Sequence, residues 1–131
     1  MTKPIIYIDR SDVHEGAGAA LREALANLVA FVQEREPQLL YYGFHIDDEA
    51  STMWVTAVHP DAASLSLHLR IGGPEFRRVG QFITLRTIDV YGEPDEDALV
   101  LLREKARMLG GASLAVHPLL AGFTRIPVSE S

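Results

Sequence analysis

The chain has 131 residues, of which 47% are hydrophobic, and a formal net charge of -6. A chain of this length and composition typically buries one compact core, so we expect a single domain. The acidic balance lacks the basic stripe that binding to a phosphate backbone requires, which argues against nucleic acid as a partner.

The sequence contains no cysteine, which excludes a disulfide framework and a thiolate metal site. Its apolar runs are far shorter than the roughly 18 to 20 residues that cross a bilayer. Met1–Pro4 leads directly into a strand-like run rather than into the apolar core of a signal peptide. We therefore expect a cytoplasmic protein without a membrane partner.

The first predicted elements are a strand and a long helix. Ile5–Ile8 is β-branched and aromatic, and it ends at the polar group Asp9–Asp12, as expected for a buried strand. In the range Glu15–Arg35, apolar residues recur at spacings of four, three and four, which is typical of one buried helical stripe. These residues are Leu21, Leu25, Leu28 and Val32. Pro37 ends this helix, because proline disfavours helical geometry in the residue before it.

A β-hairpin is predicted next. Leu39–Asp47 and Thr52–His59 alternate as strands and flank the polar turn 48–51, a spacing that fits an antiparallel pair. Both faces of these strands carry several apolar residues. Since helices on one side of a sheet leave the other side bare, we expect the second face to pack against another large surface.

The rest of the chain predicts a helix, a strand, a further helix and a short strand. Asp61 suits a helix start, because its carboxylate accepts from exposed backbone donors, and the helix breaks at Gly72–Pro74. A strand is expected over Phe82–Tyr91 and ends at a glycine. Acidic residues at one end and basic residues at the other predict a helix over Asp95–Leu109, followed by a short strand over Ser113–His117.

This order of elements predicts an α+β fold, a ferredoxin-like βαββαβ arrangement with an antiparallel sheet. We assign residues 1–94 to this ferredoxin-like domain. Residues 95–131 form a C-terminal helical extension with a short tail, which we expect to pack on the same domain.

From Ile5 to Tyr91 the chain resembles the dimeric α+β barrel proteins, particularly the antibiotic biosynthesis monooxygenase-like domains. The resemblance depends on the order of elements, on the junction Val58–Ala62, on Leu65-x-x-His68, and on Phe76 after a glycine-proline break. In that family two sheets pack face to face across a two-fold axis, so the resemblance implies a homodimer. Its enzymes oxidise quinol-like or polyketide aromatics, often without a metal or flavin, or degrade haem, in a pocket between helices and sheet.

Two departures from the family disfavour haem degradation. Haem-degrading relatives have a tryptophan at the strand end where this chain has His59, and they carry a haem-ligating histidine in the stretch where residues 76–82 have none. The resemblance therefore implies a cofactor-independent monooxygenase acting on a small aromatic or quinol-like compound. The alternative is a non-catalytic dimeric module that binds a small molecule or another protein.

His68 and His59 are the candidate catalytic residues. His68 lies beside the apolar stripe of its helix, so it can project into a cavity between helix and sheet and accept a substrate proton near neutral pH. The competing interpretation is a partly exposed histidine with a local hydrogen bond. His59 stands at the end of its strand and is the other candidate for this role under the resemblance.

Tyr41, His45, Trp54, Phe76 and Arg86 are the candidate substrate-binding residues. Gly43 lies between Tyr41 and His45 on one strand face, which leaves room for a ligand or for another backbone. Trp54 fits a pocket wall, a core or an interface. A charge such as Arg86 among apolar residues needs a partner, and we favour a structural ion pair with a carboxylate such as Asp89 or Glu75 over an anionic substrate.

The five histidines do not indicate a metal site. Their spacings match no pair of ligands on one helix, and a zinc site requires three or four convergent ligands. We therefore predict no metal and no cofactor, and we expect the ligand to be a small apolar or aromatic compound.

Overall fold

The computed structural model describes residues 3–125 and confirms the predicted α+β fold. The elements follow one another as β1 (Ile5–Val13), α1 (Gly18–Arg35), β2 (Tyr41–Asp47), β3 (Thr52–His59), α2 (Ala62–Ile71), α3 (Gly73–Gly80), β4 (Ile83–Tyr91), α4 (Glu96–Met108) and β5 (Ser113–His117). No helix among the described residues is long and apolar enough to span a membrane.

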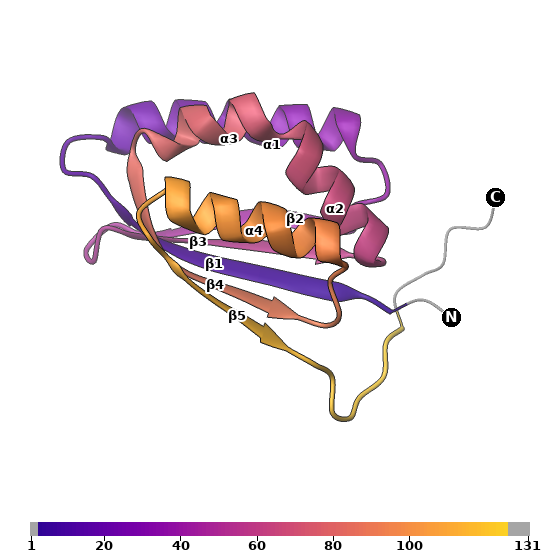
Figure 1. Cartoon of the computed structure of the whole chain (residues 1–131). Helices are drawn as coiled ribbons and strands as arrows, with labels where there is room; N and C mark the ends of the chain where they lie inside the picture. Colours follow the sequence, from indigo (N-terminus) through magenta and orange to yellow (C-terminus); the bar gives the residue numbers. More distant parts are fainter. Residues whose placement is uncertain (1–2, 126–131) are drawn as a thin grey trace.

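One sheet carries all five strands in the order β2-β3-β1-β4-β5. Its first four strands pair antiparallel, and β5 joins the edge of β4 in parallel. The helices all lie on one face of the sheet, where α1 runs beside α3 and α4 crosses beside α2 (Figure 1). We call this the covered face and the opposite one the open face.

The central strand is longer than its sequence predicts. β1 continues from Ile5 to Val13, so the polar run after Ile8 lies inside the strand rather than at its end. The reason is that β1 is paired along both edges, with β3 on one side and β4 on the other. Its alternation places Tyr7 and Asp9 on the covered face, where both side chains are buried.

A β-bulge changes the expected alternation of β4. On β1, Arg10 pairs with Thr87 but Ser11 pairs with Leu85, which leaves Arg86 as an extra residue. Leu85 is buried on one side of the bulge and Ile88 on the other, at a spacing of three rather than two. A simple period of two therefore does not describe which residues of β4 face the helices.

Two helices begin as the sequence predicts. The carboxylate of Asp61 accepts from the backbone N–H of Ser64 at 2.9 Å at the start of α2. Asp95 caps α4 in the same way, accepting from Ala98 N at 2.8 Å and from the Ser66 hydroxyl at 2.7 Å. These hydrogen bonds to the charged form lower the pKa of Asp95.

Candidate functional site

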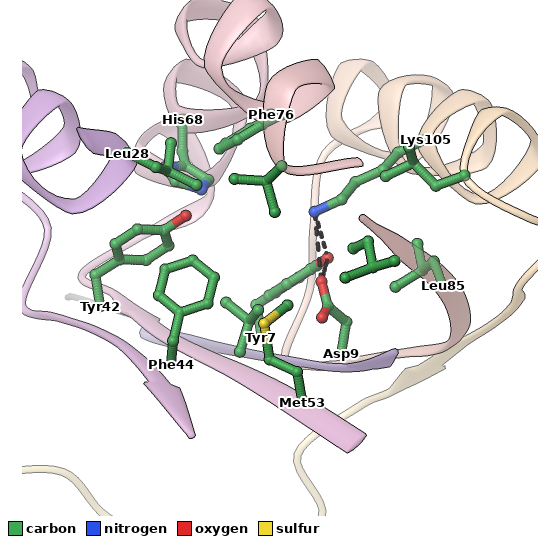
Figure 2. A pocket seen from close by; sticks show the side chains of 14 residues that line it. Tyr7, Asp9, Leu28, Tyr42, Phe44, Met53, His68, Phe76, Leu85 and Lys105 are labelled. Atoms are coloured by element: carbon green, nitrogen blue, oxygen red, sulfur yellow. Dashed lines mark hydrogen bonds and ion pairs between the residues drawn. The ribbon is translucent and has the colours of Figure 1, made fainter. Parts of the chain in front are cut away.

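A small cavity lies between the helices and the covered face of the sheet (Figure 2). Its volume is about 30 Å³, which is room for a water molecule. Aromatic rings and several convergent polar groups form much of its wall. The polar and aromatic lining residues are Tyr7, Asp9, Tyr42, Phe44, His68, Phe76 and Lys105.

His68 is held in the cavity wall by a buried carboxylate. Its Nδ1 lies 2.7 Å and 2.9 Å from the two oxygens of Glu36, and the two side chains are 5% and 0% exposed. Because an ionised carboxylate only accepts, Nδ1 carries the proton and donates to Glu36. In the neutral ring Nε2 is then the acceptor, and among residues 3–125 it has no hydrogen-bond partner.

The end of α1 explains how Glu36 reaches His68. Pro37 disfavours helical geometry in Glu36, whose backbone leaves the helix at φ -127° and ψ 67° after its N–H bonds to Val32 O. The Glu36 side chain is thereby buried against α2, which carries His68. The proline that stops the helix thus also directs this carboxylate inward.

Aromatic rings surround the imidazole of His68. The ring centroids of Tyr42 and Phe76 lie 5.2 Å and 5.0 Å from its own, Tyr42 in an edge-on arrangement. Burial raises the pKa of Tyr42 well above 10, with smaller contributions from the charges of Asp9 and Glu36, so its hydroxyl keeps its proton. The wall beside His68 is therefore apolar apart from a neutral phenol.

His59 packs behind His68 and does not line the cavity. The ring centroids are 5.4 Å apart, and His59 Nδ1 lies 2.7 Å from the Ser64 hydroxyl, which accepts from Gln38 Nε2. The Nε2 of His59 is buried without a partner among the described residues. Burial, and to a lesser extent the neighbouring His68, lower the pKa of His59 to about 3, so this ring is neutral at physiological pH.

A second polar cluster, Tyr7, Asp9 and Lys105, lies at the other side of the cavity (Figure 2). The Nζ of Lys105 on α4 donates to the Tyr7 hydroxyl at 2.7 Å and lies 3.4 Å from Asp9 Oδ2. Tyr7 in turn donates to Asp9 Oδ2. Burial, then the charge of Asp9 and this hydrogen bond, raise the pKa of Tyr7 well above 10, so the phenol stays a donor.

The structure brings some of the predicted site residues together. His68 and Phe76 both line the cavity, and His59 contacts His68 from behind. The roles assigned to these three residues from the sequence remain predictions. Their proximity follows from the contact of α2, which carries His68, with β3, which ends at His59, and from α3, which carries Phe76 and follows α2 directly.

The other predicted residues lie on the open face, away from this cavity. His45 and Trp54 are directly paired across β2 and β3. Tyr41 covers Gly43, since a Cβ at Gly43 would meet the Tyr41 hydroxyl at 2.5 Å. The space predicted beside this glycine is thus filled by a side chain of the same strand.

Arg86 forms the structural ion pair that we favour from its sequence context. Its partner is Asp12, with Nε and Oδ2 2.7 Å apart, rather than Asp89 or Glu75. Both side chains are about half exposed, so the pair is accessible to solvent. The bulge at Arg86 accounts for this exposure, because it takes the residue out of the alternation with its apolar neighbours.

Sequence reasoning missed four polar residues around the cavity. Ile5, Tyr7 and Asp9 follow one another at a spacing of two. This spacing is the signal that places all three on one strand face. Glu36 carries no local signal apart from the proline that follows it. Lys105 is one of several basic residues in the last turns of a helix, where the helix dipole explains it without a cavity.

Among residues 3–125, no group of three or more histidine or acidic side chains converges as metal ligands would. No protein-family model matches the chain, and no curated protein matches its sequence. Known structures, in contrast, match its fold closely.

MupZ from Pseudomonas fluorescens superposes with a TM-score of 0.71 and 19% identity, covering 98% of this chain and 99% of MupZ. SnoaB, a cofactor-independent oxygenase from Streptomyces nogalater, has a TM-score of 0.60 and 19% identity, covering 71% of this chain and 95% of SnoaB. A protein from Caulobacter crescentus, provisionally named an antibiotic biosynthesis monooxygenase, has a TM-score of 0.59 and 18% identity, covering 68% and 88%. The predicted resemblance is therefore confirmed for the fold: this chain has the ferredoxin-like α+β fold of the antibiotic biosynthesis monooxygenase-like proteins.

Proposed function

We propose that the protein is a cofactor-independent monooxygenase that acts on a small aromatic or quinol-like compound. The observation that carries this proposal is the buried pair of His68 and Glu36 in the cavity wall. The carboxylate fixes the ring and its tautomer and leaves Nε2 without a hydrogen-bond partner among residues 3–125, in a side chain that lines the cavity, which is the arrangement of an oriented general base. SnoaB, which shares the fold, is a cofactor-independent oxygenase.

The first chemical step is removal of a proton from a substrate hydroxyl. The O–H bond breaks, its proton moves to Nε2 of His68, and Glu36 stabilises the imidazolium that results. The aromatic wall formed by Tyr42 and Phe76 excludes water from the resulting phenolate. The imidazole and the carboxylate thus supply the proton chemistry, and the cavity supplies the dry surroundings.

Molecular oxygen then reacts with the electron-rich anion. One oxygen atom replaces a ring hydrogen and becomes a quinone carbonyl. The other leaves as water, which takes up that hydrogen and the proton held on His68. The substrate itself supplies all the electrons for this reduction, and no external reductant enters. An acid–base site is therefore sufficient protein machinery for the reaction.

The small volume of the cavity is relevant to the alternative function, a non-catalytic dimeric module. About 30 Å³ is well below the roughly 150 Å³ of a cavity that admits benzene, so an aromatic substrate must displace lining side chains. A cavity this small favours the non-catalytic dimeric module as the second candidate.

Oxygen uptake with a panel of substituted phenols and hydroquinones tests the proposal. We expect turnover by the unmodified protein and a loss of about a hundredfold or more in His68→Gln, because a positioned base contributes roughly that factor. His14→Gln is the matched control, since His14 lies on the surface and bonds to Thr84. Absence of turnover on every compound would favour the non-catalytic module, and equal rates in both variants would refute His68 as the base.

We also propose that the protein is a homodimer that assembles through the open face. One row of paired residues crosses that face and is apolar and partly exposed: Tyr41, Val58, Ile6 and Tyr91. A contiguous apolar face on a sheet without covering helices is typical of an interface. Light scattering coupled to gel filtration should give twice the chain mass, and Ile6→Lys combined with Tyr91→Lys should give the monomer mass. A monomeric unmodified protein would refute the dimer.

A further inference from the structure

We infer that Lys105 is a further catalytic residue, which donates a hydrogen bond to a substrate oxygen and stabilises the anion that His68 generates. The inference rests on the proposed function and names the substrate class more closely. The substrate is a phenol that carries a conjugated carbonyl group, with its hydroxyl at His68 and its carbonyl oxygen at Lys105.

The first support is the position of the Lys105 ammonium group. It reaches from α4 into the cavity wall, and the side chain is only 18% exposed. Its Nζ lies 4.8 Å from the ring centroid of Tyr7 and 5.1 Å from that of Phe76. An ammonium group that lies near two aromatic rings and is largely shielded from water interacts with a ligand oxygen more strongly than it would in bulk water.

The second support is an unused donor. Lys105 has three N–H groups, of which one donates to Tyr7 at 2.7 Å and another points to Asp9 at a long 3.4 Å. Within residues 3–125 the third has no oxygen acceptor, and only the rings of Tyr7 and Phe76 lie near the ammonium group otherwise. Since this nitrogen lines the cavity, a ligand oxygen is the acceptor that would satisfy it.

A purely structural ion pair explains the cluster less well. In such a pair both carboxylate oxygens would be hydrogen-bonded, because unpaired buried charge is costly. Here Asp9 Oδ1 is buried without a partner among the described residues, and Oδ2 is shared between Tyr7 and Lys105. Asp9 and Tyr7 therefore act as positioning residues. They hold Lys105 at the cavity and leave one of its hydrogen-bond donors available to a ligand.

The two ends of the cavity have opposite hydrogen-bonding character. When its ring is neutral, His68 presents an acceptor, and Lys105 presents donors from a different helix on the other side of the space (Figure 2). A ligand that matches both ends carries a donor at one end and an acceptor at the other. Conjugation between its two oxygens lets the negative charge made at the hydroxyl move onto the oxygen that faces Lys105.

The proton balance of this step is simple. The substrate O–H bond breaks, the N–H bond forms on His68, and the charge is delocalised onto the carbonyl oxygen. Lys105 keeps all its protons and contributes only a charge-assisted hydrogen bond. No oxidant takes part, so the step can be observed as binding in the absence of oxygen.

Two ligands of the same shape test the inference: para-hydroxyacetophenone, which has the acceptor, and para-ethylphenol, which lacks it. Calorimetric titration without oxygen should show that the unmodified protein prefers the ketone by about tenfold or more, the typical value of one hydrogen bond to a charged group. Lys105→Met should remove this preference. Arg107→Met, on the same helix but 74% exposed, should retain it.

A further variant controls for folding. Lys105→Met leaves Asp9 buried without its cation, so Lys105→Met combined with Asp9→Asn keeps the cluster neutral and should also lose the preference. Retention of the preference in both variants, or failure of the unmodified protein to prefer the ketone, overturns the inference. Oxygen uptake is scored separately: ketone preference without turnover refutes only the monooxygenase, and His68-dependent turnover without a Lys105-dependent preference refutes only this inference.

Discussion

The two faces of the sheet differ in how they use the same kinds of residue. On the covered face, Asp9 and Lys105 meet in the cavity wall, and the carboxylate is 4% exposed. On the open face, Asp12 and Arg86 form a shorter contact of 2.7 Å, but the two side chains are 43% and 50% exposed. Burial, rather than the length of the contact, therefore determines how much the loss of one partner of such a pair destabilises the fold.

The largest expected effect separates these two ion pairs. We expect Lys105→Met to lower the free energy of unfolding by about 3 to 5 kcal/mol, because it leaves the Asp9 charge buried and uncompensated. Arg86→Met should cost less than about 1 kcal/mol, since water solvates Asp12. Urea unfolding of both variants measures the difference, and equal losses would contradict the interpretation that burial decides.

A smaller effect is expected at the other buried carboxylate. Glu36→Met removes the acceptor of His68 Nδ1, and an unsatisfied buried donor costs about 1 to 3 kcal/mol. Glu34→Met, in the last turn of the same helix but exposed, should change the stability by less than about 0.5 kcal/mol. If Glu36→Met unfolds at the same urea concentration as Glu34→Met, the buried pair contributes nothing to stability.

A further prediction concerns the pH dependence of stability, to which His59 contributes. Its pKa is about 3 in the folded chain and 6.5 when solvated, so between these values the unfolded chain binds a proton that the folded chain does not. Stability should therefore fall as the pH falls below 6.5, by up to about 1.4 kcal/mol per pH unit from this residue alone.

The neutral variant His59→Gln isolates this contribution. The substitution leaves every carboxylate in place, so the difference in unfolding free energy between the two proteins should shrink as the pH falls from 6.5. Urea unfolding in a series of buffers gives this difference. A difference that stays constant over the range would mean that His59 is not buried as a neutral ring.

The fold could be predicted from the sequence to a large extent because its signals are local. The leucine stripe of α1, the stop at Pro37 and the caps at Asp61 and Asp95 each depend on neighbours in the chain. The site could be predicted only in part. His68 and Phe76 follow helix and loop patterns, whereas Glu36 lies 32 residues from His68 and Lys105 lies 96 residues from Asp9.

The open-face residues show a second limit of sequence reasoning. Alternation on a strand tells which residues share a face, but it does not tell which face the helices cover. Alternation correctly predicts that Tyr41 and His45 share one face of β2. That this face points away from the cavity follows from the helices, which all lie on the other face of the sheet. Their role in substrate binding stays a prediction, and activity loss in His45→Gln would support it.

By itself, the order of strand, helix and turn patterns determined the ferredoxin-like arrangement, because hydrophobic periodicity and helix caps act within a few residues. Which polar groups contact one another depends, in contrast, on the packing of elements that are far apart in the chain. Packing α2 and α4 over β1 removes water from Glu36, His68, Asp9 and Lys105, and these side chains then pair with one another across long stretches of sequence.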